Sequence, residues 1–403
     1  MPTYLTIPLD RARFLVIAIL ISLLFSPPIT NLLQLLLVIT ILSSADLRNR
    51  VGSTFKQPAV KWLLAFYLVI IAGTFYSIGS QKEIIGIATG WRKILLLPIA
   101  LALFDDSRWK LNALNALILV STLTASVSFL LFALNIPIAK FSNELGIIVR
   151  NHSTQGMFFS IAAFSAITLL FFEKASSFNR RLYLITCSIL LIGNIALIST
   201  GRSGYVVLLI CCFTLLLTLI FYKKQTTKRV KLITTLFFVA IVVTLAFSPT
   251  SHQRINQAIS ELKNAPKATE LTSMGIRVIF WANTIDLIKK QPIFGYGTGS
   301  FKTAYSEKIQ GASGLAATSA SDPHNQYLKI IAEHGFVGLS IFLAFLCSML
   351  YLKPSLQYKV LALGAAFAWM TTCLANTHFS TFSEGTFIYV WLGTMLANEH
   401  PLS

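Results

Sequence analysis

The chain has 403 residues, of which 55% are hydrophobic and only 12% are charged, against roughly 25% charged residues in an average soluble protein. Such a chain cannot cover a water-facing surface with polar side chains, which excludes an ordinary soluble globular protein. The net charge of +18 would suggest nucleic acid in a soluble chain, but in a membrane protein Lys and Arg collect in cytoplasmic connections. Positive charge outside those connections suggests an anionic ligand.

About twelve apolar stretches follow one another along the chain, each near the 20 residues that a helix needs to cross a bilayer. Because backbone groups in lipid must pair within their own segment, each stretch is predicted to be a helix, and the fold class is an all-α polytopic membrane protein. The predicted spans are 13–27, 30–45, 59–78, 84–104, 111–133, 153–172, 182–199, 203–222, 230–248, 336–352, 358–375 and 385–398.

Basic residues are concentrated in alternate connections, as the pairs Arg48 and Arg50, and Arg108 and Lys110, illustrate. The positive-inside rule therefore predicts that these connections and both termini are cytoplasmic. The long connection 249–335 then lies outside, where a loop of this length is usually functional. The predicted organisation is helices 1–9 over residues 1–248, a loop with the active region over 249–335, and helices 10–12 over 336–403.

Two patterns inside the long loop predict local structure. Residues 275–290 carry apolar side chains at helical spacing and end before Pro292, which predicts an amphipathic helix. Gly295, Gly297 and Gly299 follow with a spacing that resembles part of a nucleotide-binding fingerprint. Because no strand and helix of a βαβ unit flank them, a tight turn with close backbone approach is predicted instead.

His324 is the strongest candidate for chemistry in this loop. Asp322 is predicted to cap a helix in which Pro323 takes the first position and Gly335 marks the end. His324 would then lie in the first turn, where the positive helix end disfavours imidazolium and leaves a neutral ring able to accept a proton. The alternative is a capping or interfacial histidine without chemistry. The remaining loop histidines, His152, His252, His334 and His378, are expected to be structural or inert.

Four cations lie where a charge is costly or unexpected. Arg202 lies in a short outer turn between two apolar spans, and Arg277 lies on the polar face of the loop helix. Arg92 and Lys93 interrupt the span 84–104 at a depth on the order of 12 Å, and intramembrane charges are functional hypotheses by default. Snorkelling is the alternative for Arg202, and a solvated surface charge is the alternative for Arg277. Together they predict a basic site at the outer membrane surface that suits phosphate.

Taken together, several segments resemble the O-antigen ligase and polymerase superfamily of bacterial envelope glycan assembly. The segments are Gly275–Arg277 with the helix after it, Pro292–Phe301, Pro323–Leu328 with Glu333–Leu339, and the turn Thr200–Ser203. These motifs cover a minor part of the chain, and the remainder resembles the superfamily in topology.

The resemblance implies a GT-C-like fold with one large, mostly helical periplasmic loop, placed in the bacterial inner membrane. It implies a glycosyltransferase that takes a glycan from undecaprenyl pyrophosphate, requires neither metal nor other cofactor, and inverts the anomeric centre. His324 matches the catalytic histidine of the family, which would deprotonate the acceptor hydroxyl. Arg202 and Arg277 match its pyrophosphate-binding arginines, and Arg92 and Lys93 are added to that site from their membrane depth.

Within the superfamily, the length, the modest loop and the basicity favour an O-antigen ligase that joins finished polysaccharide to the lipid A-core oligosaccharide. The alternatives are an O-antigen polymerase and a protein O-oligosaccharyltransferase. A transporter is the alternative outside the superfamily. It is disfavoured because the acidic residues cluster near span ends and no inverted repeat is visible. The expected partners are the lipid-linked donor, the acceptor and membrane lipid, and not nucleic acid.

Overall fold

The computed structural model describes residues 7–138, 144–173, 177–199, 201–221, 235, 239 and 273–399. Every regular element in these ranges is a helix, which confirms the predicted fold class. The elements are α1 (Ile7–Ser22), α2 (Pro27–Ser43), α3 (Ala45–Thr54), α4 (Pro58–Gly73), α5 (Gln81–Gly90), η2 (Trp91–Leu95), α6 (Leu96–Leu103), α7 (Ser107–Ala133), α8 (His152–Phe172), α9 (Phe178–Leu197), α10 (Arg202–Phe221), α13 (Ser273–Lys290), α14 (Phe301–Lys308), η4 (Gly314–Ala317), α15 (Gln326–Ser348), η5 (Met349–Tyr351), α16 (Leu356–Thr372) and α17 (Phe382–Leu396).

Each predicted span within the described ranges overlaps at least one helix, and the span 84–104 comprises α5, η2 and α6. Six helical runs are long and apolar enough to cross a membrane, or seven if α2 and α3, which meet at 104°, form one bent span. Helices α1, α4, α16 and α17 are apolar but only 15 to 17 residues long. The polytopic architecture is therefore confirmed, and the number of twelve spans remains a prediction. The predicted span 230–248 and loop residues 249–272 lie outside the described residues, apart from Thr235 and Val239.

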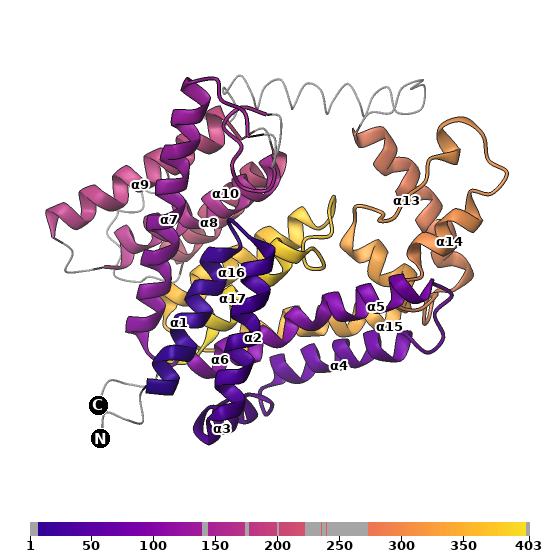
Figure 1. Cartoon of the computed structure of the whole chain (residues 1–403), viewed down its shortest axis with the longest axis horizontal. Coiled ribbons are helices and arrows are strands. Elements are labelled where there is room, and N and C mark those ends of the chain that lie inside the picture. The colour runs from indigo at the N-terminus through magenta and orange to yellow at the C-terminus, as the bar shows by residue number, and fades with distance from the viewer. Residues whose placement is uncertain are drawn as a thin grey trace.

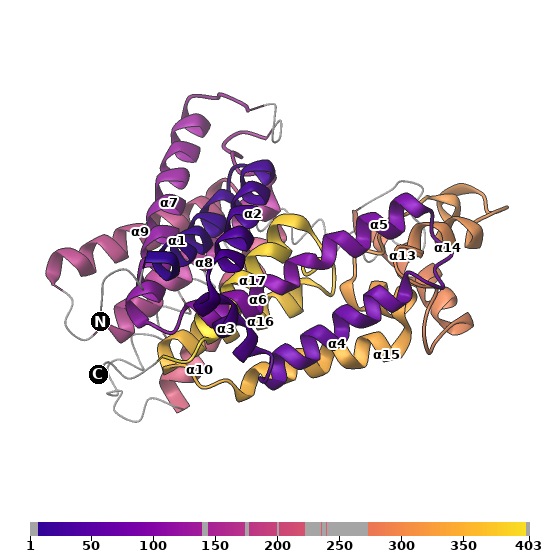
Figure 2. The same cartoon turned by 60° about the horizontal axis from the view of Figure 1, so that its bottom comes forward.

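The helices form two regions that are visible in both views (Figures 1 and 2). In the first region α8 is the central helix and packs against α7, α9, α10 and α16. Its contact with α10 is close because Gly156 faces Gly204, where a Cβ on Gly204 would lie 2.8 Å from the Cα of Gly156. In the second region α4 and α15 run side by side away from this bundle, and α13 and α14 pack near the outer end of α15.

The glycine-rich turn after α13 forms the predicted close backbone approach. Gly295, Gly297 and Gly299 all have left-handed φ angles, of 67°, 92° and 74°. The N–H of Gly297 donates to the carbonyl of Glu333 in α15 at 2.8 Å, and the N–H of Thr298 donates to the carbonyl of Gly73 in α4 at 3.0 Å. The turn therefore ties the outer helices to both long helices of the second region.

Gly335 ends the first helical stretch of α15, as predicted, but a second stretch follows it directly. Its φ of 65° and ψ of −171° place a kink inside α15, and the helix then continues to Ser348. The helix can continue because the N–H of Phe336 donates to the carbonyl of Pro292 at 2.8 Å, which replaces a bond lost at the kink. A Cβ at position 335 would lie 1.9 Å from the carbonyl oxygen of Ile293, so the backbones approach too closely for any other residue.

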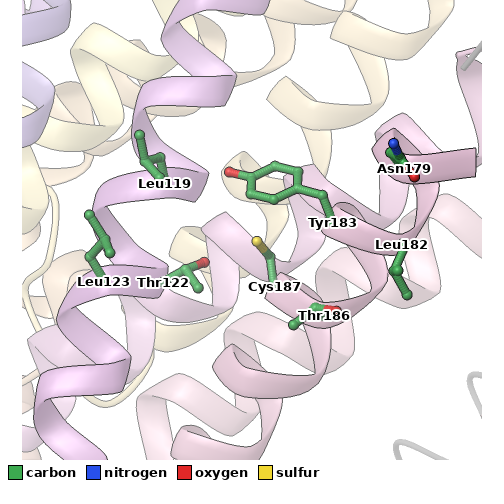
Figure 3. Close-up of a pocket in the computed structure, with 8 residues that line it drawn as sticks. All are labelled: Leu119, Thr122, Leu123, Asn179, Leu182, Tyr183, Thr186 and Cys187. Atoms are coloured by element: carbon green, nitrogen blue, oxygen red, sulfur yellow. The ribbon is translucent and has the colours of Figure 1, made fainter. Parts of the chain in front are cut away.

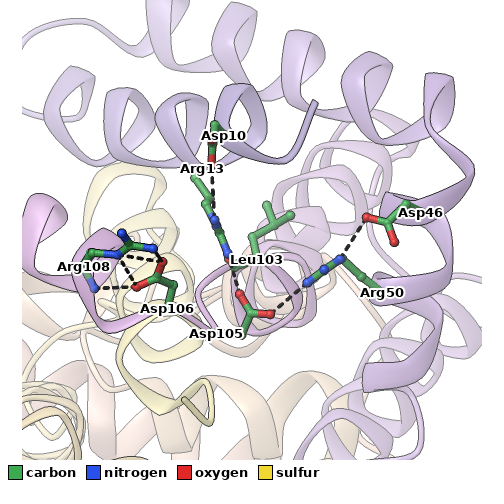
Figure 4. A network of polar contacts seen from close by, with 8 residues as sticks. All are labelled: Asp10, Arg13, Asp46, Arg50, Leu103, Asp105, Asp106 and Arg108. Carbon is green, nitrogen blue, oxygen red and sulfur yellow. Dashed lines mark hydrogen bonds and ion pairs between the residues drawn. The ribbon is translucent and has the colours of Figure 1, made fainter. Parts of the chain in front are cut away.

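An ion-pair network joins two of the predicted basic connections at one end of the bundle (Figure 4). The buried Arg13 guanidinium donates to the carbonyl of Leu103 at 2.7 Å and to Asp105 at 2.5 Å, and Arg50 donates to Asp105 at 2.8 Å. Asp10, Asp46, Asp106 and Arg108 complete the network. Connections 44–57 and 104–106 therefore lie on the same side, as the alternation of charge requires. That this side is cytoplasmic remains a prediction.

Candidate active site

His324 lies exposed on the short segment before α15, and α13 holds this segment in place. The N–H of His324 donates to Asp322 Oδ1 at 2.7 Å, and Trp281 Nε1 donates to the carbonyl of Pro323 at 2.9 Å. The ring of Phe280 stacks on the imidazole with centroids 6.2 Å apart and 15° between the planes. The backbone of His324 is left-handed, with φ of 52°. Several independent contacts thus fix a conformation that a non-glycine residue rarely adopts.

The predicted cap of this helix was wrong. The N-cap is Asn325, whose side chain accepts two backbone N–H groups of the first turn, both at 3.0 Å. His324 therefore precedes α15, and neither Asp322 nor Pro323 belongs to the helix. The reason is local: Asn325 has the extended backbone of an N-cap, whereas the left-handed φ of His324 cannot belong to a helix.

The structure supports the predicted neutral imidazole of His324, but the cause is not the helix end that the sequence suggested. Although part of the ring is exposed, its partial desolvation lowers the pKa of His324, and the nearby charges of Arg277 and Lys329 lower it further, against the opposite effect of Asp322. Burial alone would raise the pKa of Asp322, but the Lys329 ammonium at 2.9 Å and the N–H of His324 hold it below its usual value. The site therefore presents a neutral base beside an ionised, paired carboxylate.

His378, which was expected to be inert, lies buried in the same site. Its Nδ1 is 3.0 Å from Thr372 Oγ1, and it interacts electrostatically with Arg277, Asp322 and Glu384. Burial lowers its pKa, against the opposing effect of the Glu384 carboxylate. No local pattern in the sequence separates His378 from an ordinary loop histidine. The sequence did contain a signal for Glu384, because Thr381 and Glu384 have the spacing of a capping box. In the structure Thr381 Oγ1 donates to Glu384 at 2.7 Å.

The first turns of three helices meet near these residues. Thr154 of α8 donates to Glu384 of α17 at 2.5 Å, which joins two of the helix starts. Gly201, directly before α10, packs against the backbone of Ser153 at the start of α8. Arg202 is thereby placed beside the first turn of α8. Helix N-termini carry partial positive charge, so their meeting favours an anion at this end of the bundle.

Arg92 and Lys93 differ in burial and in hydrogen-bond partners. Lys93 is buried and donates to the carbonyl oxygens of Ser380 at 2.5 Å and Thr381 at 2.7 Å, so it holds the loop that precedes α17. Arg92 is exposed and donates to Asn31 of α2 at 3.1 Å. Both residues line a polar pocket of about 170 Å³ between α2, α5 and α17. Lys93 is attracted by the Glu384 carboxylate and repelled by Lys329 and Arg150, so it lies within electrostatic range of the helix that follows His324.

A larger hollow of about 440 Å³ lies between α7 and α9 and has a different character (Figure 3). Its lining is almost entirely apolar, with Leu119, Leu123 and Leu182 among the side chains, and Tyr183 and Cys187 also face it. Such a surface is typical of contact with lipid chains and offers no cluster of charged groups. The described titratable groups that interact with one another gather instead around His324, Arg277 and His378.

Comparison with known proteins agrees with this location. Residues 187–343 match the family described as O-antigen ligase, Wzy_C, and this segment contains Arg202, Arg277 and His324. A protein of Haemophilus influenzae described as uncharacterized is 29% identical over 109 residues, which is 26% of this chain. The chain spans 27% of that protein's length in the match. The family match confirms the resemblance to the O-antigen ligase and polymerase superfamily.

Proposed function

Because residues 187–343 match the O-antigen ligase family, we propose that the protein is an O-antigen ligase of the bacterial inner membrane. It transfers O-antigen polysaccharide from undecaprenyl pyrophosphate to a sugar hydroxyl of the lipid A-core oligosaccharide at the periplasmic face, in lipopolysaccharide biosynthesis. The observation that carries the proposal is an exposed histidine, His324, kept neutral beside the cation Arg277 in the family-matched segment.

His324 is the general base of this reaction. It accepts the proton of the acceptor hydroxyl while that oxygen attacks the anomeric carbon of the donor sugar, with inversion. The bond from that carbon to the pyrophosphate breaks, and the leaving pyrophosphate takes the electron pair. Arg277 has two effects, because its charge lowers the pKa of His324 and also stabilises the negative charge that develops on the leaving group.

The other cations complete the pyrophosphate site of the proposal. Arg202 acts together with the helix starts of α8 and α10, where a phosphate meets backbone N–H groups and a guanidinium. Arg92 and Lys93 contribute to this pyrophosphate site from the polar pocket that they line at the start of α17. Lys93 in addition holds the loop before α17 through its two carbonyl bonds.

The test is His324→Ala in a strain that lacks the native gene, with lipopolysaccharide resolved on a gel. We expect the long-chain ladder to disappear while core-lipid A and lipid-linked polymer persist. The membrane level of the variant is measured, and Arg108→Ala, whose guanidinium pairs with Asp106 at 3.0 Å, serves as the control.

Three other results would overturn parts of the proposal. An intact ladder in His324→Ala removes the catalytic function of that residue. Core bearing a single repeat in the strain without the gene identifies a polymerase. Normal lipopolysaccharide with loss of glycan from a protein identifies an oligosaccharyltransferase.

A further inference from the structure

Arg150 shares an unusual backbone conformation with His324. Its φ is 34°, and among the described residues only Asn135 and His324 are other non-glycine residues with positive φ. The side chain of Arg150 is exposed, whereas Val149 before it and Thr154 after it are completely buried. A strained residue persists only where its surroundings determine its conformation, and such residues cluster at functional sites.

A buried polar clamp, formed by Ser128, Gln155 and Asn194, holds the segment before Arg150. Gln155 Oε1 accepts the two backbone N–H groups that precede Arg150, at 2.9 and 3.2 Å, and its Nε2 donates to the carbonyl of Gly146 at 3.2 Å. Ser128 Oγ donates to the same carbonyl at 2.5 Å. Asn194 Nδ2 donates to Ser128 Oγ at 2.8 Å and its Oδ1 accepts from Gln155 at 3.2 Å.

Burying the polar side chains of this clamp costs free energy that apolar side chains in the same place would not cost. Its three residues are completely buried and come from three different helices, α7, α8 and α9. Burying each without a partner would cost about 1–3 kcal/mol, and apolar residues could fill the same space. A fully paired polar network instead fixes one backbone arrangement. Here that arrangement is the loop that ends in Arg150.

The guanidinium of Arg150 reaches the start of α17. Its Nη1 donates to Ser383 Oγ at 3.2 Å, and this is its one hydrogen bond among the described residues. No carboxylate of the described chain forms an ion pair with it, because the oxygens of Glu384 accept from Thr154 and Thr381. Arg150 also interacts electrostatically with Lys93. Its remaining donors are thus available where helix starts already favour an anion.

We propose that Arg150 binds the pyrophosphate of the lipid-linked donor, and that Ser128, Gln155 and Asn194 are positioning residues that hold it for this contact. This inference rests on the proposed function. It adds a donor-binding residue that lies outside the family-matched segment 187–343 and that contributes a planar fork suited to two phosphate oxygens.

The experiment measures binding of undecaprenyl pyrophosphate to the full chain in nanodiscs. Arg150→Ala should weaken binding by about 10- to 100-fold, as expected for loss of a hydrogen bond to a charged group. The affinity of Arg150→Lys should lie between those of the wild type and Arg150→Ala, because the lysine ammonium is a point charge without the planar guanidinium fork. Arg150→Gln is the second variant, since it can keep the bond to Ser383 if Arg150→Ala fails to fold. Arg108→Ala, at the opposite end of the bundle, is the matched control and should leave Kd unchanged.

The clamp is tested by a double-variant cycle. Gln155→Leu should weaken binding while Arg150 is still present, and Gln155→Leu with Arg150→Ala should be no weaker than Arg150→Ala alone. A purely structural clamp would instead give additive losses in Kd. Additive losses would overturn the positioning function of Gln155.

The outcomes separate this inference from the proposed function. A wild-type chain that neither binds undecaprenyl pyrophosphate nor transfers glycan would overturn both. A wild-type chain that binds and transfers, a His324→Ala variant that binds without transfer, and Arg150→Ala and Arg150→Gln variants that bind within twofold of wild type would overturn the inference about Arg150 alone.

Discussion

The two ends of the bundle use arginine in opposite ways. In the network of Figure 4, Arg13, Arg50 and Arg108 are matched by Asp10, Asp46, Asp105 and Asp106, so positive charge is neutralised within the protein. At the other end, Arg150 donates to a hydroxyl and Lys93 donates to backbone carbonyls. Neither cation forms an ion pair among the described residues, although the carboxylate of Glu384 interacts electrostatically with the buried Lys93.

This difference explains the large net charge better than topology alone. A neutralised network holds helices together, and an end with uncancelled cations and several helix starts is suited to an anionic ligand. Stability should therefore depend most on buried carboxylate pairs, whereas ligand binding should depend on cations that lack them. The following predictions are ordered from the largest expected effect to the smallest.

Lys329→Met should have the largest effect, because Lys329 is the buried cation of the active end that does have a carboxylate partner. Asp322 would lose the ammonium at 2.9 Å, and breaking a buried pair costs about 3–5 kcal/mol. Thermal unfolding in detergent measures this loss. The double variant Lys329→Met with Asp322→Asn should recover much of the stability. A single variant as stable as wild type would show that the pair contributes little.

Arg13→Ala should lower stability by about 2–3 kcal/mol and leave donor binding unchanged. It removes bonds to Asp10, Asp105 and the carbonyl of Leu103 from a buried site at the end opposite His324. Thermal unfolding and Kd for undecaprenyl pyrophosphate are measured on the same preparation. A large change in Kd at unchanged stability would break the division between the two ends.

The pH dependence of transfer tests the charges around His324. Because its pKa is lowered, the neutral base persists below the ordinary histidine value near 6.5, and the rate should decline only at more acidic pH. Arg277→Lys should leave the acidic limb of the pH–rate profile nearly in place. Arg277→Ala removes a charge that lowers the pKa, so the limb should move to higher pH, whereas Asp322→Asn should move it to lower pH. A limb that stays in place in both variants would exclude His324 as the titrating base.

Asn325→Ala should have the smallest effect, about 1 kcal/mol of stability. It removes the side-chain cap of α15 and a bond to the carbonyl of Leu374 at 2.9 Å. Transfer should fall modestly, because His324 is the next residue. Asn325→Ser, which keeps a capping oxygen, is the control and should recover most of the lost stability.

The sequence predicted those features that depend on local pattern. The all-helical polytopic class, the helix at 275–290 and the turn at Gly295–Gly299 follow from hydrophobic period and glycine spacing, and the structure confirms them. The assignment of His324 as catalytic base came from motif resemblance and remains a proposal. Its predicted place inside a helix was wrong, because propensity alone does not distinguish Asp322 from Asn325 as the cap.

Features that depend on pairing between distant segments could not be predicted. Arg150 and Ser383 are 233 positions apart, and Lys93 and Thr381 are 288 positions apart. No periodicity or spacing connects such residues in a single sequence. The same holds for the helical stretch that follows Gly335, which depends on carbonyls supplied by Pro292 and Ile293.

The clamp before Arg150 also bears on how the protein is made. Ser128, Gln155 and Asn194 belong to three consecutive helices, so all its partners are synthesised before α10. The N-terminal half can therefore set the conformation of Arg150 during membrane insertion. Helices α15 and α17 then dock against a surface that is already shaped, which makes the order of translation part of how the site is assembled.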